Sequence, residues 1–336
     1  MTFDADFYLS RIKELHLAVR EVVREQQKKF TTADLSQVAA QGSGDVSYKI
    51  DVGAEERINK FFANFERPVI VISEATGRET FPKGINEEDC EAVIIIDPID
   101  GTRPIMYNLD SAFVLTGVAP YKGPETSLKD IEIAVQTELP TTRAFLADQL
   151  YAIKGKGAKS DEWNLIDNRV RRQIVPQPSQ ASTIKHGFAM LIKYFPGGKN
   201  ILAEVEEELF RNVLGPVQKG KALGFDHQYI SSAGVFYRTL VGSYRFCGDI
   251  RPWLEPILAK HGSELGLCAH PYDVCTKLIG DEIGVITTDL QGHELDCPLD
   301  TQTNVGSLVY ANRHIRNEIE GPLLAAMERV AKKYLA

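Results

Sequence analysis

IIIDPIDGTRP, residues 94–104, runs three β-branched residues directly into two aspartates, a glycine and a threonine. The isoleucines predict a buried strand, and Asp-Pro and Asp-Gly are common turn dipeptides. The strand therefore ends on two carboxylates, Asp97 and Asp100, that lie three positions apart. Either this is only a sharp turn, or the turn holds something with a positive charge.

The first half of the chain predicts two helices packed on a sheet. Apolar residues recur with helical spacing in residues 5–29, and a second helix follows with Asp51 at its N-cap position. A polar turn is expected between them at residues 41–44. The pattern then changes to that of strands and a hairpin, at residues 68–73, 92–96, 112–119, 131–137 and 143–158.

The second half follows a polar stretch near residues 168–182 and predicts another α/β layer. Helices are expected at residues 201–214, 233–244, 253–261 and 323–335, and strands near residues 283–288 and 307–311. The length of 336 residues suits two domains, which we place at residues 1–150 and 151–336.

Composition limits the classes of function. The net charge of −8 argues against binding a nucleic acid polymer, because such binding needs a basic surface. No apolar run predicts a membrane span, and the N-terminus lacks the pattern of a signal peptide. Five cysteines without a CxxC pair suit a reducing cytoplasm. We therefore expect a cytoplasmic protein that binds neither a nucleic acid polymer nor a membrane.

Four carboxylates stand at strand ends or at a helix start, namely those of Asp51, Glu74, Asp97 and Asp100. Strand ends meet at one edge of a sheet, so these groups could converge. Two carboxylates about 4 Å apart repel by roughly 1 to 4 kcal/mol, so a stable cluster predicts a cation. Oxygen ligands favour Mg²⁺, with Mn²⁺ or Ca²⁺ as substitutes, and the Ile99 carbonyl could join them.

The residues after the aspartates predict a phosphate site. Gly101 and Thr102 begin a short helix, whose free backbone N–H groups can bind phosphate. An acidic cluster beside a phosphate cradle indicates phosphoryl chemistry.

Several segments resemble, in order, the signature segments of the inositol monophosphatase-like, Mg²⁺-dependent and Li⁺-sensitive phosphatases of the inositol monophosphatase/fructose-1,6-bisphosphatase superfamily. They are GDVSYKID (44–51), ISEATG (72–77), IIIDPIDGT (94–102) and HPYDVCTKLIGDEIGVITTDLQG (270–292). YAIKGKGAKSDEWNL (151–165) resembles the hairpin of that family and SSAGVFYRTLVGS (231–243) its small-residue helix. The resemblance implies an α/β fold, a layered αβαβα sandwich, and a homodimer.

The resemblance also implies roles for individual residues. Glu74, Asp97 and the Ile99 carbonyl would bind one metal ion, and Asp97, Asp100 and Asp273 a second, with Glu74 serving a weaker third. Thr102, Asp51 and Glu74 are the implied catalytic residues, and the Gly101 and Thr102 amides would hold the phosphate. The implied reaction is in-line attack by a metal-activated water without a phosphoenzyme. Ca²⁺ and Li⁺ would inhibit it.

The resemblance also implies substrate contacts, and the sequence departs from the family pattern at several positions. The residues expected to contact the substrate are Asp100, Arg103, Ser232, Ala233 and Glu264, although Glu264 stands two positions further from Asp273 than the family pattern has it. Ala75 replaces a usual glutamate, Tyr272 a usual tryptophan, and Gly284 stands where paired glycines are usual. Ala75 and the missing second glycine predict weaker inhibition by lithium.

Three functions remain open at this stage. The leading interpretation is a Mg²⁺-dependent phosphomonoesterase for a small polyol or sugar phosphate. The first alternative is a 3′(2′),5′-bisphosphate nucleotidase or an enzyme like fructose-1,6-bisphosphatase, because Arg103 adds a positive charge beside the turn. The second alternative is a non-catalytic binding or regulatory protein. The sequence argues against it, because the five acidic residues named above and Thr102 are all present.

Overall fold

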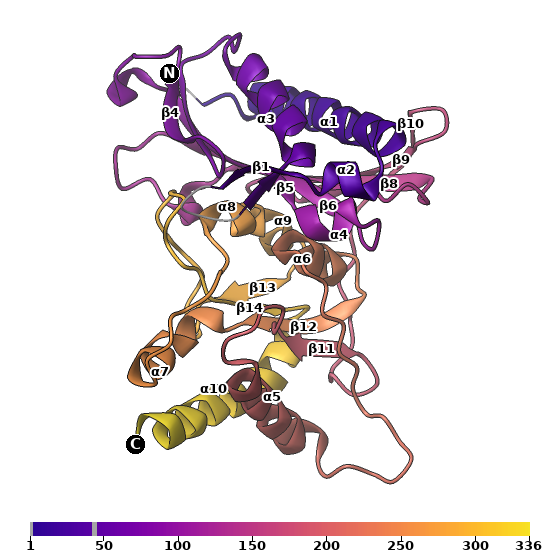
Figure 1. Cartoon of the computed structure of the whole chain (residues 1–336), viewed down its shortest axis with the longest axis vertical. Coiled ribbons are helices and arrows are strands. Elements are labelled where there is room, and N and C mark those ends of the chain that lie inside the picture. Colours follow the sequence, from indigo (N-terminus) through magenta and orange to yellow (C-terminus); the bar gives the residue numbers. More distant parts are fainter. Residues whose placement is uncertain (1–2, 42–45) are drawn as a thin grey trace.

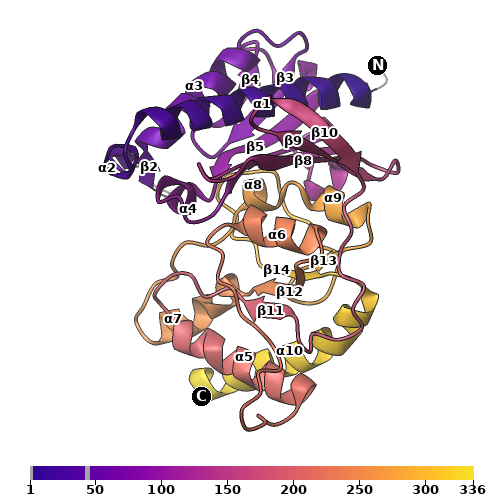
Figure 2. The same ribbon diagram turned by 90° about the vertical axis from the view of Figure 1, so that its right-hand side faces the viewer.

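The computed structural model describes residues 3–41 and 46–336 and has five layers (Figures 1 and 2). Two helices cover one face of a large sheet, three short helices separate that sheet from a smaller one, and two long helices cover the far side of the smaller sheet. This is the layered αβαβα sandwich that was expected.

The first layer contains α1 (Ala5–Lys29) and α3 (Lys49–Phe62), with α2 (Thr32–Leu35) and the hairpin β1 (Val38–Gln41) and β2 (Val46–Tyr48) between them. The apolar stripe of α1 is buried, as its spacing predicts. Residues 42–44 of the predicted polar turn lie outside the described residues. The N-cap prediction for Asp51 is wrong: α3 begins two residues earlier, and the Asp51 carboxylate accepts the Tyr48 N–H at 2.7 Å.

The large sheet has eight strands in the order β10-β9-β8-β7-β6-β5-β3-β4. All neighbours are antiparallel except β3 and β5, which are parallel. The strands are β3 (Val69–Ser73), β4 (Gly77–Phe81), β5 (Ala92–Asp100), β6 (Ala112–Pro120), β7 (Ile133–Leu139), β8 (Leu146–Ile153), β9 (Ala158–Asn164) and β10 (Arg169–Ile174). The short helices η1 (Glu87–Asp89), α4 (Thr102–Met106) and η2 (Leu128–Asp130) connect them.

The middle helices α6 (Ser232–Leu240), α8 (Pro271–Val274) and α9 (Lys277–Asp281) separate the sheets. The second sheet has the order β11-β12-β14-β13, made of β11 (Phe188–Leu191), β12 (Tyr244–Asp249), β13 (Ile286–Thr288) and β14 (Ser307–Tyr310). The outer helices are α5 (Lys199–Leu214) and α10 (Arg313–Leu335), and η3 (Arg251–Leu254) leads into α7 (Glu255–Lys260).

Two further predicted helix boundaries are wrong. The helix expected at residues 233–244 ends at Leu240, because a turn with Gly242 at φ +82° follows it and Tyr244 begins β12. The last helix begins ten residues before the predicted start, where Asn312 caps it by accepting the His314 and Ile315 N–H groups.

The strands β3, β5, β6 and β7 of the large sheet are buried on both faces. Val69 and Val71 of β3 pack toward α1 and α3, whereas Ile70 and Ile72 pack toward the middle helices. Alternate residues therefore enter two different cores, which explains the unbroken apolar runs in the sequence. The domain division proposed at residue 150 falls inside β8, and the sheet continues to Ile174. The division stays a prediction.

Among the described residues, no helix combines the length and the apolar character that a membrane crossing requires. All five cysteines are buried and none forms a disulfide.

Candidate active site

Strand pairing brings the first acidic groups to one edge of the large sheet. Ser73 pairs with Ile96 in the parallel β3–β5 ladder, so Glu74 and Asp97 follow at the same edge. The β5–β6 register shifts between Asp97 and Asp100, where three steps along β5 match two along β6. Asp97 continues the alternation of Val93 and Ile95, which face the middle layer, and the bulge brings Asp100 to the same face.

Asp97, Asp100 and Asp273 form a tight group. One carboxylate oxygen from each lies within 4.8 Å of the other two. Asp273 comes from the first turn of α8, and its carboxylate accepts the His270 N–H at 2.6 Å. The helix start thus fixes the orientation of a side chain that is 176 positions away from Asp97 in the sequence.

The group is electrostatically costly without a cation. Burial, and then the charges of Glu74, Asp100 and Asp273, raise the pKa of Asp97 well above its usual value. Burial and the Asp100 charge do the same to the pKa of Asp273. Burial raises the pKa of Asp100 to about 6, although the N–H of Ala233 opposes the shift by hydrogen bonding.

The donor set fits a divalent cation. All of its atoms are carboxylate oxygens, the kind of ligand that Mg²⁺, Mn²⁺ and Ca²⁺ prefer. Asp97 and Asp100 are only 2% and 8% exposed, so water cannot offset their repulsion well. Glu74 is exposed and lies outside the tight group, but its charge acts on both Asp97 and Asp273. The individual ligand assignments stay predictions.

Thr102 contacts two of the other predicted residues. Its Oγ1 lies 3.1 Å from Asp51 Oδ1 and 2.9 Å from the Ile99 carbonyl oxygen. Since the hydroxyl has one proton, it donates to one of them at a time and can accept from a third group. The contact joins α3 to the turn after β5, so the predicted pair Thr102 and Asp51 is brought together.

Gly101 occupies a position that only glycine suits. Its φ of +94° lies in the left-handed region. A Cβ there would also lie 3.1 Å from Ser231 Cβ. The glycine thus lets the start of α6 approach the turn closely.

The predicted substrate contacts separate into three groups. Arg103 and Ser232 line a cavity together with the three aspartates, and the Arg103 guanidinium lies 5.6 Å from the centre of the Tyr48 ring. Ala233 is buried and donates its N–H to Asp100. Glu264 is exposed and is not among the described residues that line the cavity. Its role in substrate binding stays a prediction.

Three residues that sequence reasoning missed line the same cavity: Tyr194, Phe195 and Arg251. The two aromatic residues follow β11, in a region whose sequence shows only weak periodicity. The Asp249–Arg251 pair carried a signal, because an acid and an arginine two positions apart at a strand end can point the same way.

Comparison with solved structures shows a shared fold. Fructose-1,6-bisphosphatase of Leishmania major in its holo form matches with a TM-score of 0.68 and 15% identity over 98% of this chain and 96% of that one. The extragenic suppressor protein SuhB of Bartonella henselae matches with a TM-score of 0.64 and 17% identity over 94% and 98%. The IMPase of Thermotoga maritima matches with a TM-score of 0.58 and 14% identity over 98% of both chains.

Comparison of sequences finds nothing similar: no protein-family model matches the chain, and neither does any curated protein. The structural matches nevertheless extend over nearly the whole chain and nearly the whole of each neighbour. The chain therefore has the fold of the inositol monophosphatase and fructose-1,6-bisphosphatase superfamily.

Proposed function

We propose that this protein is a Mg²⁺-dependent phosphomonoesterase that hydrolyses a small polyol or sugar phosphate. One observation carries the proposal: two buried carboxylates from β5 and a partly buried one from α8 converge within 4.8 Å, beside a threonine that contacts a further aspartate. Such a group is unfavourable by itself and becomes favourable around divalent cations.

Different residues would bind the metal ions, activate the water and hold the phosphate. Asp97, Asp100 and Asp273 would hold the cations, with Glu74 and the Ile99 carbonyl as further ligands. The cations, when bound, supply the positive charge that phosphoryl transfer requires. Thr102 and Asp51 orient the attacking water and take up its proton, and the Gly101 and Thr102 N–H groups receive the phosphate oxygens.

Further properties belong to the same proposal. Mg²⁺ is the working ion, with two or three per site, Mn²⁺ can replace it, and Ca²⁺ and Li⁺ inhibit. Inhibition by lithium is weaker than in a typical inositol monophosphatase, because Ala75 and the single Gly284 depart from the family pattern. The protein works as a cytoplasmic homodimer on a small phosphorylated substrate.

A bisphosphate substrate is the second candidate, because Arg103 lines the cavity beside the proposed phosphate site. A guanidinium there can bind a second phosphate through two parallel hydrogen bonds.

Phosphate release from three substrates tests these functions. The purified protein is assayed in Mg²⁺ with inositol 1-phosphate, fructose 1,6-bisphosphate and adenosine 3′,5′-bisphosphate. Preference for the monophosphate supports the leading proposal, and preference for either bisphosphate supports the second candidate. No release from any of them, in a folded protein that binds Mg²⁺, would instead favour a non-catalytic role.

A further inference from the structure

Arg251 is a buried arginine in the wall of the cavity that contains the three aspartates. It is 7% exposed and begins η3 directly after β12 and Ile250. Arginine is rarely buried unless its charge is paired, so its neighbours decide what it can do there.

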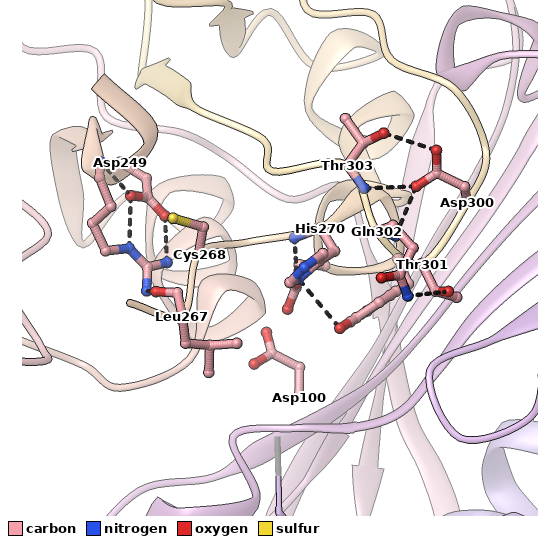
Figure 3. A network of polar contacts seen from close by, with 12 residues as sticks. Asp100, Asp249, Leu267, Cys268, His270, Asp300, Thr301, Gln302 and Thr303 are labelled. Atoms are coloured by element: carbon pink, nitrogen blue, oxygen red, sulfur yellow. Dashed lines mark hydrogen bonds and ion pairs between the residues drawn. The ribbon is translucent and has the colours of Figure 1, made fainter. Parts of the chain in front are cut away.

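The guanidinium is held by the end of β12 and by the segment that precedes α8. Its Nε and Nη2 donate to the two carboxylate oxygens of Asp249 at 2.8 and 2.5 Å. Its Nη1 donates to the Leu267 carbonyl oxygen at 2.8 Å. Figure 3 shows Asp249 and Leu267 at the two ends of this network. A guanidinium has five N–H groups, so these contacts leave one N–H on each terminal nitrogen.

Two rings complete this side of the cavity. The centres of the Tyr194 and Phe195 rings both lie 5.5 Å from the Arg251 guanidinium carbon, and both residues line the cavity. The rings limit the rotamers of the arginine and exclude water around it. The donors of Arg251 are therefore fixed in direction before any ligand arrives.

The pairing with Asp249 also decides which ligand suits Arg251. A bidentate carboxylate offsets the charge of the guanidinium, which reduces its attraction for a second phosphate. The remaining N–H groups can still donate to uncharged oxygens. Hydroxyl groups of a sugar or a polyol match this combination of fixed donors and apolar ring faces.

We propose that Arg251, oriented by Asp249, donates hydrogen bonds to hydroxyl oxygens of the leaving group and so selects hydroxylated monophosphates. This inference rests on the proposed phosphatase function and deepens it. Arg251 is then a specificity-determining residue, and Asp249 is a positioning residue that acts through it. Neither is required for the chemistry at phosphorus.

The test compares two phosphates that differ only in their hydroxyl groups, myo-inositol 1-phosphate and cyclohexyl phosphate. Removing Arg251 alone would leave the buried Asp249 carboxylate without its partner, which is strongly destabilising. The variant is therefore the double substitution Asp249→Asn with Arg251→Met, which keeps the apolar part of the arginine side chain and removes both charges.

Arg251→Lys is a second variant, which retains the positive charge but not the planar pair of N–H donors. The control is Arg245→Met, because Arg245 of β12 donates to the backbone of residues 183 and 185 and is not among the described residues that line the cavity.

We expect the wild type to prefer myo-inositol 1-phosphate. The double variant should lose about tenfold or more in kcat/KM on that substrate, mainly through KM, with less than about a twofold change on cyclohexyl phosphate. Arg251→Lys should lose selectivity in the same direction, and Arg245→Met should retain it.

Several results would overturn the inference. Equal losses of kcat/KM on both substrates would mean that Arg251 has only a structural role. If the double variant does not fold, unchanged selectivity in Arg251→Lys would lead to the same conclusion. A wild type that hydrolyses both phosphates equally well would also overturn it, while leaving the phosphatase function intact. A folded wild type that hydrolyses neither these nor p-nitrophenyl phosphate in Mg²⁺ would instead refute the function on which the inference rests.

Discussion

Asp100→Asn should make the metal-free protein more stable while removing its response to Mg²⁺. Burial raises the pKa of Asp100 from 3.8 to about 6, so at pH 7 the folded state contains an ionised group that it disfavours. A rise of two pKa units corresponds to about 3 kcal/mol of lost stability. Asparagine keeps an oxygen for the Ala233 N–H but makes a weaker, uncharged hydrogen bond, so we expect a net gain of about 2 kcal/mol.

The pH dependence follows from the sign of the shift. A carboxyl group whose pKa is raised by folding destabilises the folded state at high pH; this penalty begins to shrink as the pH falls through the folded pKa and is gone below the unfolded pKa. The advantage of Asp100→Asn should therefore be full at pH 7 and above, shrink between pH 7 and pH 4, and vanish below pH 4.

The assay is urea unfolding followed by the fluorescence of Trp163 and Trp253, in chelator and in Mg²⁺. Mg²⁺ should stabilise the wild type far more than the variant. Asp300→Asn is the matched control, because hydrogen bonds from Thr303 and Gln302 lower the pKa of Asp300 despite partial burial (Figure 3). That variant should be less stable than the wild type. An Asp100→Asn variant no more stable than the wild type at pH 7 in chelator would show that the Asp100 charge does not destabilise the folded protein.

Three further predictions concern single side chains. Asp97→Asn should reduce kcat far more than Asp51→Asn, because Asp97 lies at the centre of the acidic group whereas Asp51 contacts the Thr102 hydroxyl; equal losses in steady-state assays would contradict this. If Arg103 binds a second phosphate of the substrate, Arg103→Ala should lose about tenfold or more in kcat/KM on a bisphosphate and less on a monophosphate. Equal losses on the two substrates would exclude that contact. Burial lowers the pKa of His16 to about 3, so its contribution is complete above pH 6.5 and is lost as the pH falls toward 3. Relative to His16→Gln, the wild type should lose about 1.4 kcal/mol per pH unit between pH 6 and pH 4 in urea unfolding, and parallel curves would contradict the shift.

Local sequence patterns were sufficient to predict elements whose own residues show a clear apolar periodicity or an apolar run. The apolar stripe of α1 predicts its bounds, Ala5–Lys29, because a surface helix must bury one face. The isoleucines of β5 predict a buried strand, and the aspartates after them stand at the sheet edge where the cluster forms. The approach of Asp273 could be predicted only through the family resemblance, since no local pattern links residues so far apart in sequence.

Other features depend on tertiary contacts that no short pattern contains. The sequence predicts Asp51 as an N-cap. In the structure its carboxylate accepts the Tyr48 N–H and contacts the Thr102 hydroxyl, because α3 packs beside the turn after β5. The sequence pattern places Tyr244 at the end of a helix, but Tyr244 begins β12, because pairing with Phe188 of β11 outweighs helix propensity there. The spacing of Arg251 from Asp249 is a local signal, but its contact with the Leu267 carbonyl oxygen has none.

Metal-dependent phosphate release decides whether Asp97, Asp100 and Asp273 form a catalytic metal site. The purified protein is assayed with p-nitrophenyl phosphate in Mg²⁺, then in excess chelator, and again after Mg²⁺ is restored. We predict activity that requires Mg²⁺, disappears with the chelator and returns with the metal, since Asp97, Asp100 and Asp273 form a site that fits cations. Full activity in metal-free buffer, or none at any Mg²⁺ concentration in a folded protein, would contradict the account.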